Sequence, residues 1–220
     1  MRPAELSAVV RCIGGGVFLP GAAQMMTLSA DRKTCRIWDA STGDDISVLA
    51  GHTGKVLGAA AFLPPSSQPS LDAPARRLRL LTVSEDGTAR LWEAASGEVL
   101  QVLRGHRKDV TGGAFFPDGE RILTVSLDCT ARVWEAASGE EVQMLEGHSA
   151  ALTSGTVFCN GQRLLTTSCD CTARVWDASG AMLCNFEGHA ASVVSGAAFC
   201  GGNQVLTVAA DGSRCIWDAP

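Results

Sequence analysis

A unit of about 42 residues recurs along the chain, and this repeat limits the possible folds more than any other feature. Each unit ends in Trp followed by Asp or Glu, and Trp92, Trp134, Trp176 and Trp217 are 42, 42 and 41 residues apart. A Gly-His pair precedes each of these tryptophans, by 28 residues from His to Trp in three units and 40 in the other. A fixed period of this length indicates a repeat architecture whose units pack on their neighbours.

Each unit has the pattern of four short strands joined by tight turns. In the most regular unit, residues 110–116 alternate with a period of two and residues 121–126 are rich in β-branched side chains. Pro117-Asp118-Gly119 and Asp128-Cys129 are typical of turns. One such sheet cannot bury both of its faces alone, so the units are expected to stack on one another. The pattern therefore predicts an all-β protein.

The Gly-His and Trp-Asp pairs, which bound a repeat of this length, resemble those of the WD-repeat (WD40) β-propeller family. The resemblance implies a single propeller domain over residues 1–220, built from five four-stranded WD-repeat blades. The repeats are expected at about 5–47, 48–101, 102–143, 144–184 and 185–218. A Pro- and Ser-rich insertion at 64–75 lengthens the second repeat and is expected to form a flexible loop.

Closure of the ring is left open by the sequence. In this family the last blade borrows its outer strand from the N-terminus, and residues 3–9 are the candidates here. That segment is short, and Pro3 lacks a backbone N–H. Three outcomes remain: a closed five-blade ring, an open or incompletely closed ring, or a fragment of a longer array. An open ring would expose a blade edge through which the chain could form oligomers.

His, Thr, Asp and Trp recur in register, and this set could be mistaken for a catalytic site. The resemblance implies instead a structural tetrad, in which hydrogen bonds run from the Trp indole to Thr, then to His, then to Asp. The members are His52, Thr82, Asp86 and Trp92; His106, Thr124, Asp128 and Trp134; His148, Thr166, Asp170 and Trp176; and His189, Thr207, Asp211 and Trp217. The first repeat has only Thr27, Asp31 and Trp38.

No enzyme activity is predicted. All four histidines of the chain belong to the tetrads, which leaves none for catalysis or for a metal. A Ser/Thr–His–Asp triad, the alternative, needs an exposed nucleophile beside a pocket and would occur once. No catalytic, cofactor-binding or metal-binding residue is therefore expected. Cys129 and Cys171 keep a metal or redox pair open as a minor alternative.

Other proteins or peptides are the expected partners. The resemblance places partner binding on one face, at the positions three and five residues after each His and just before the turn Asp. In the second and third repeats these residues are Lys55, Leu57, Glu85, Asp109, Thr111 and Leu127.

The predicted function is a non-catalytic scaffold for protein–protein interaction. The alternative is a substrate-recognition adaptor of a larger complex such as a ubiquitin ligase. Its docking variant has Arg two residues after the Trp-Asp pair, where this chain has Ser41, Ala95, Ala137, Ser179 and Pro220.

Composition excludes several other classes. The net charge is −5 without a basic block, which argues against nucleic-acid binding. No apolar run approaches the roughly 18–20 residues that span a bilayer, and Glu5 interrupts what would be the core of a signal peptide. The nine cysteines are odd in number and do not suggest a disulfide framework. We therefore expect an intracellular protein of the cytoplasm or nucleus, with no membrane contact.

Overall fold

The computed structural model describes residues 9–10, 17–19, 23–63 and 78–219. In these residues twenty strands form five antiparallel sheets, which we call the first to fifth blades in chain order. The strands coincide with the alternating and β-branched segments of each repeat, which suit a pleated and half-buried surface. The prediction of an all-β fold with five repeated sheets is confirmed.

The first four blades follow one plan, in which consecutive strands pair in order. The first blade consists of β2 (Val17–Phe18), β3 (Gln24–Leu28), β4 (Cys35–Asp39) and β5 (Asp45–Leu49). The second consists of β6 (Val56–Phe62), β7 (Arg79–Ser84), β8 (Thr88–Glu93) and β9 (Val99–Arg104), with β1 (Val9–Val10) added beside β6. The third consists of β10 (Val110–Phe115), β11 (Arg121–Ser126), β12 (Ala131–Glu135) and β13 (Glu141–Leu145). The fourth consists of β14 (Leu152–Phe158), β15 (Arg163–Ser168), β16 (Ala173–Asp177) and β17 (Met182–Phe186).

Among the described residues the fifth blade has three strands, β18 (Val193–Phe199), β19 (Gln204–Ala209) and β20 (Arg214–Asp218). Two short 3₁₀ turns, η1 (Cys159–Gly161) and η2 (Cys200–Gly202), follow the first strands of the fourth and fifth blades. No helix in the described part of the chain is long and apolar enough to cross a lipid bilayer.

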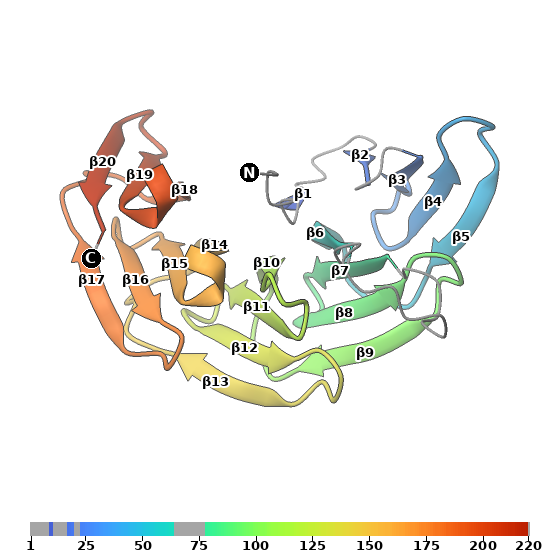
Figure 1. The fold of residues 1–220 in the computed structure, drawn as a ribbon, viewed down its shortest axis with the longest axis horizontal. Coiled ribbons are helices and arrows are strands. Elements are labelled where there is room, and N and C mark those ends of the chain that lie inside the picture. Colours follow the sequence, from blue (N-terminus) through green and yellow to red (C-terminus); the bar gives the residue numbers. More distant parts are fainter. Residues whose placement is uncertain (1–8, 11–16, 20–22, 64–77, 220) are drawn as a thin grey trace.

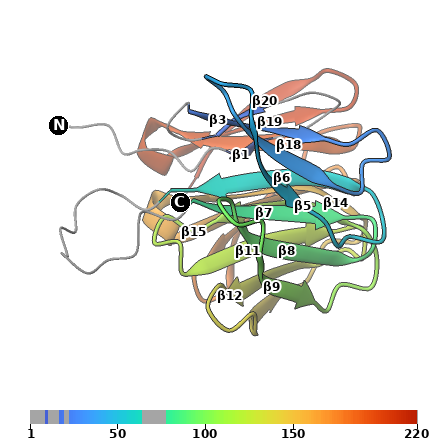
Figure 2. The ribbon, with the colours of Figure 1, turned by 90° about the vertical axis from the view of Figure 1, so that its right-hand side faces the viewer.

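The blades follow one another along an arc, with the first and the fifth at its two ends (Figure 1). The strands β6, β10, β14 and β18 lie on the inner side of the arc, where neighbours contact one another. The last strands, such as β9, β13 and β17, form the outer rim. Seen from the side, strands such as β6 and β7 run across the thickness of the arc (Figure 2).

Strand pairing does not close this arc into a ring within the described residues. Val9, one of the predicted closing residues 3–9, pairs with Ala60 of β6 instead of with β20; residues 3–8 lie outside the described part. The prediction of four strands in every blade is wrong for the second, which has five. The fifth has three among the described residues, and most of the segment expected to supply its fourth lies outside them. The second blade gains its strand because the inner edge of β6 offers backbone groups that β1 can pair.

The insertion of the second repeat falls between two strands of one blade. β6 ends at Phe62 and β7 begins at Arg79, so residues 64–75 connect neighbouring strands of the sheet. These residues, and with them the expected flexible loop, lie outside the described part. Both flanking strands keep the register seen in the other blades, with Phe62 opposite Arg79. The insertion is therefore compatible with the regular blade.

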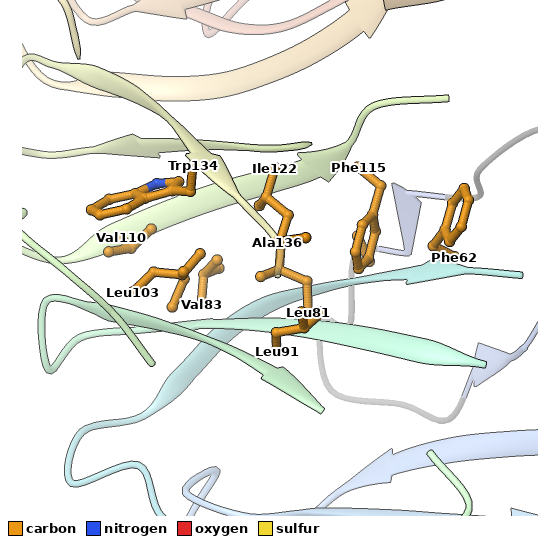
Figure 3. Packing of buried hydrophobic residues seen from close by; sticks show 12 residues of the cluster. Phe62, Leu81, Val83, Leu91, Leu103, Val110, Phe115, Ile122, Trp134 and Ala136 are labelled. Carbon is orange, nitrogen blue, oxygen red and sulfur yellow. The ribbon is translucent and has the colours of Figure 1, made fainter. Parts of the chain in front are cut away.

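Side chains between neighbouring blades form the core. Figure 3 shows the contact of the second and third blades, where Trp134 and Ile122 of the third pack against Leu81, Val83 and Leu103 of the second. All of these residues are buried. Burial of a large apolar side chain stabilises a fold by about 1.5–3 kcal/mol. The blades are thus held together by apolar faces that each sheet could not bury alone.

Two cysteines occupy backbone conformations that favour glycine. Cys129 and Cys171, in the turns between the second and third strands of their blades, have φ of 71° and 67°. The equivalent residues of the second and fifth blades are Gly87 and Gly212, with φ of 77° and 84°. A side chain with a Cβ is strained in this left-handed region, so these two turns hold a residue that the local geometry disfavours.

Replacing these cysteines by glycine should stabilise the protein. We expect Cys129→Gly and Cys171→Gly each to raise the free energy of unfolding by about 0.5–1 kcal/mol, because the strain of the left-handed backbone is removed. Urea titration followed by circular dichroism measures the change. The matched control is Cys215→Gly in β20, which should lower stability because glycine weakens a strand interior. A loss of stability at Cys129 and Cys171 as well would contradict the interpretation.

Candidate functional site

The recurring polar residues meet inside the blades, each from a fixed structural element. Thr124 lies on β11, Trp134 on β12, His106 in the loop before β10, and Asp128 in the turn between β11 and β12. Trp134 Nε1 is 2.7 Å from Thr124 Oγ1, His106 Nε2 is 2.9 Å from the same oxygen, and His106 Nδ1 is 2.9 Å from Asp128 Oδ2. The four side chains therefore form one continuous hydrogen-bonded chain.

The second and fourth blades repeat this geometry. From Trp to Thr, Thr to His and His to Asp, the distances are 2.8, 2.8 and 2.9 Å in the second blade, for Trp92, Thr82, His52 and Asp86. They are 2.9, 3.0 and 2.8 Å in the fourth blade, for Trp176, Thr166, His148 and Asp170. The threonines and tryptophans are buried in both.

The chemistry of the groups determines the direction of these bonds. The Trp134 indole can only donate, so its hydrogen is directed at Thr124 Oγ1. The single hydroxyl hydrogen of Thr124 is then donated to His106 Nε2, which must be the unprotonated nitrogen of a neutral ring. The other nitrogen, Nδ1, carries the hydrogen and donates it to the Asp128 carboxylate. Within this set of four side chains, every polar group has a hydrogen-bond partner, and the imidazole carries no positive charge.

The carboxylate also ties two backbone segments together. The backbone N–H of Arg107 donates to Asp128 Oδ2 at 3.0 Å, which joins the Gly-His loop to the turn. The other carboxylate oxygen accepts the hydroxyl of Thr130 at 2.7 Å and its N–H at 3.0 Å. Burial raises the pKa of Asp128, but the bonds from Thr130, Arg107 and His106 outweigh it and hold the pKa well below its ordinary value.

The other buried pairs behave in the same way. Burial raises the pKa of Asp170, yet hydrogen bonds from Thr172 and His148 lower it to about 2. Burial lowers the pKa of His52, His106 and His148, and the neighbouring carboxylates offset this effect only in part. Each pair is thus a neutral imidazole beside an ionised carboxylate.

In the fifth blade the sequence-based assignment of Asp211 is wrong. Trp217 and Thr207 bond at 2.8 Å, and Thr207 lies 2.7 Å from His189 Nε2. His189 Nδ1, however, lies 3.0 Å from the Ser213 hydroxyl, and Asp211 is exposed. Threonine occupies this position in the second to fourth blades, where its hydroxyl lies 3.5, 3.4 and 3.3 Å from His Nδ1 beside the Asp carboxylate. In the fifth blade the serine hydroxyl is the group that bonds to the imidazole.

The first blade contains the reduced set that its sequence predicts. The Trp38 indole donates to Thr27 Oγ1 at 2.7 Å, and no His is available to continue the chain. Asp31 accepts the backbone N–H of Lys33 at 2.9 Å and the Ser29 hydroxyl. Both Asp31 and Lys33 are exposed. The carboxylate of Asp31 therefore bonds only within its own turn.

The glycines of the Gly-His pairs in the second to fourth repeats each meet an arginine, a contact that sequence reasoning missed. A Cβ on Gly51 would lie 2.2 Å from Arg90 Nη1, and one on Gly147 would lie 2.3 Å from Arg174 Nη1. These arginines stand two residues before the Trp and pass directly over the glycine. The recurrence of Arg at that position together with Gly before His is the signal that could have revealed the contact. Glycine is favoured here because φ is 152° at Gly51 and 140° at Gly147, a backbone conformation that L side chains rarely adopt, and a Cβ would also displace the guanidinium.

The six residues of the predicted binding face belong to the second and third blades, and we call them the candidate binding surface. Lys55 Nζ is 3.8 Å from Glu85 Oε1, and both side chains are exposed. The Glu85 N–H donates to the Lys55 carbonyl at 2.9 Å, and the Leu127 N–H donates to the Asp109 carbonyl at 3.0 Å. Each blade therefore brings its loop and its turn together there.

Thr111 differs from the other members of the candidate binding surface. Its Oγ1 lies 2.9 Å from the Leu152 carbonyl of the fourth blade, to which the hydroxyl donates, and 3.2 Å from the Val125 carbonyl of its own blade. Thr153 repeats the pattern, with its hydroxyl 2.6 Å from the Val193 carbonyl of the fifth blade. Thr111 thus joins neighbouring blades, and its hydroxyl is already engaged.

No metal-binding group was found in the part of the chain that the structure describes, where no three His, Cys, Asp or Glu side chains gather. Cys129 and Cys171 are free thiols there. The Cys171 thiol lies 3.9 Å from the Cys169 carbonyl of its own turn. This contact is local to one blade and does not bring the two thiols together.

Comparison with known protein families identifies repeats that the structure shows as blades. The family model for the WD domain, G-beta repeat, matches residues 43–93, 97–135 and 139–177, which together make up more than half of the chain. The chain therefore belongs to the WD-repeat family. This match confirms the resemblance drawn from the Gly-His and Trp-Asp pairs.

Several curated relatives are guanine nucleotide-binding protein β subunits. The chain is 35% identical to the subunit of Arabidopsis thaliana over 105 residues, which are 45% of this chain and 25% of that protein. It is 33% identical to the subunit of Solanum tuberosum over 110 residues, 47% of this chain and 26% of that protein. The subunit of Oryza sativa subsp. japonica is 28% identical over 110 residues, with the same coverage. The chain thus spans about a quarter of the length of these relatives.

Removing the shared hydroxyl should destabilise a complete tetrad more than an incomplete one. Thr124→Val keeps the shape of the side chain but leaves Trp134 Nε1 and His106 Nε2 without a partner. We expect the free energy of unfolding to fall by about 1–3 kcal/mol for each unpaired group. In the control, Thr27→Val, only the Trp38 indole loses its partner. Equal losses in urea titrations of the two variants would contradict the role given to the histidine.

Acid should destabilise the protein in two steps. The folded pKa of His52, His106 and His148 lies below the unfolded value of about 6.5. The unfolded chain therefore binds protons first, and the free energy of unfolding falls as the pH drops below about 6.5. Asp86, Asp128 and Asp170 have lowered pKa values as well and add a second loss below about pH 4.

Urea midpoints measured across this pH range test the first step. A His106→Gln variant, which cannot take up a proton at that position, should show a shallower fall below about pH 6.5 than the unmodified chain. A midpoint that rises between neutral pH and about pH 5.5 would show that the histidines gain protons on folding, contrary to the neutral tautomer deduced above.

Proposed function

We propose that the chain is a non-catalytic protein-interaction module that binds partner proteins or peptides. The observation that carries the proposal is the separation of two residue sets. The side chains capable of acid–base chemistry are bonded to one another inside the blades. The residues that we propose to meet a partner belong to two neighbouring blades and lie outside these bonded sets: Lys55, Leu57, Glu85, Asp109, Thr111 and Leu127.

The buried tetrads support a structural role. Thr124 would be the nucleophile of a Thr–His–Asp triad, yet it is fully buried and its oxygen already accepts the Trp134 indole hydrogen. A nucleophile must reach a substrate beside a pocket. The same bonded set recurs in the second and fourth blades, as expected for a device that holds each blade together.

The candidate binding surface has the composition of a small interface. Leu57 and Leu127 are partly exposed on neighbouring blades and supply apolar anchors. The Lys55–Glu85 pair is solvent-exposed, and such pairs contribute only about 0–1 kcal/mol. A partner can therefore replace this ion pair with its own charges at little cost. Charged groups around apolar anchors suit a protein or peptide ligand.

Close approaches between the second and third blades support treating these residues as one surface. A Cβ on Gly87 would lie 3.4 Å from the His106 carbonyl and 3.5 Å from that of Lys108, so the turn of the second blade touches the loop of the third. A Cβ on Gly58 would lie 3.9 Å from the Thr111 carbonyl. Membership of the WD-repeat family and the likeness to G-protein β subunits, which are subunits by name, also favour a protein partner.

Substitution of the two leucines tests the surface. The chain is immobilised and used to capture proteins, which are identified and quantified by mass spectrometry. We expect Leu57→Asp combined with Leu127→Asp to reduce partner affinity at least about tenfold, because charges then replace two apolar anchors.

The control carries the same change at two exposed rim positions of the same blades, Leu100→Asp and Val142→Asp. Circular dichroism checks that both double variants remain folded. Capture that is unaffected by Leu57→Asp and Leu127→Asp, or is lost only in the rim control, would contradict the proposed surface.

A further inference from the structure

The main apolar contact at each of the four junctions between blades is made in the same way. The Trp-bearing face of the later blade packs against an aliphatic face of the earlier one. Trp92 packs with Ile37 and Leu49, and Trp134 packs with Leu81 and Leu103. The same contacts join Trp176 to Val133 and Leu145, and partly buried Trp217 to Val175 and Phe186. Each blade thus has a Trp face and an aliphatic face, and the two differ in shape and composition.

The aliphatic face of the fifth blade is exposed to solvent. The residue before each Trp marks this face, and its exposure is 0% at Ile37, 1% at Leu91, 2% at Val133 and 0% at Val175. At Ile216 it is 63%. Leu206 lies directly across the sheet from Ile216 and is partly exposed, although its counterparts in the second to fourth blades are buried.

The Trp face of the first blade, at the other end of the arc, is also exposed to solvent. Met25 pairs with both Phe18 and Trp38, so the three side chains share this face. Phe18 occupies the place of Phe115, which is 1% exposed, yet Phe18 is 65% exposed. Trp38 is likewise only partly buried, whereas the tryptophans of the next three blades are buried.

The exposure of Phe18 and Ile216 means that the two end faces do not cover each other within one chain. Figure 1 shows the first and fifth blades at separate ends of the arc. The two faces nevertheless have the same chemistry as the pairs of faces that meet inside the arc. A face of this kind, bare at each end, is an association surface for a complementary blade.

We propose that these faces bind a second copy of this chain head to tail, with the Trp face of one copy on the aliphatic face of the other. The contact repeats the arrangement that already holds neighbouring blades together. It is heterologous, because different surfaces of the two copies meet, so each added copy leaves one bare face of each kind. Association is therefore expected to continue beyond the dimer as the protein concentration rises.

Two single substitutions each disable one of the two faces that would meet. Phe18→Asp removes the Trp face and keeps the aliphatic face, while Ile216→Asp does the reverse. Light scattering coupled to size exclusion should show that the unmodified chain gains mass with concentration and that each variant alone stays monomeric. An equimolar mixture of the two variants should form a dimer and go no further, since only one complementary pair of faces remains.

The control is Val142→Asp, a position on the outer rim that is 61% exposed, which should associate like the unmodified chain. Phe18→Ser and Ile216→Ser add no charge and should give the same pattern, with folding checked by circular dichroism. A monomeric unmodified chain, association that survives in either single variant, or a mixture that stays monomeric would each overturn the proposal. Association lost with Val142→Asp would place the contact at the rim instead.

Discussion

The apolar contact between consecutive sheets is the interaction on which the rest of this structure depends. A sheet of three or four short strands exposes two faces, and neither is covered by the sheet itself. Trp134 and Ile122 of one blade cover Leu81 and Val83 of the blade before it, and equivalent residues do so at the other junctions. The curved array follows because each junction has the same two faces. The same logic explains why the ends of the array remain exposed, as Phe18 and Ile216 are.

The polar network depends on this apolar framework. Tight packing removes water from the Trp and Thr positions, so their hydrogen-bonding groups must find partners within the protein. Thr124 meets this need by accepting from Trp134 and donating to His106. Asp128 then bonds to both the loop and the turn on one side of the blade. The network consequently fixes the loops that carry the candidate binding surface, while its own members stay inside the blade.

Function in such an array is left to residues that neither the core nor the network uses. Leu57 and Leu127 stand beside the tetrad positions but outside the bonded chain. Thr111 shows how small this set is, because its hydroxyl is taken up by the Leu152 carbonyl of the next blade. The end faces are a second kind of unused surface. They belong to the first and fifth blades, whereas the candidate binding surface depends on side chains that vary between repeats.

The sequence by itself determined the repeat, the all-β class, the family and the residues that form three complete tetrads. These features follow from the local sequence pattern. The spacing of His, Thr, Asp and Trp within each repeat determines which strand or turn each residue occupies. Only the tertiary structure decided what lies between segments distant in the chain. It placed Val9 beside Ala60, gave His189 a bond to Ser213 in place of Asp211, and set Arg90 over Gly51. It also left the two ends of the arc apart, because no local pattern specifies whether the first and last blades meet.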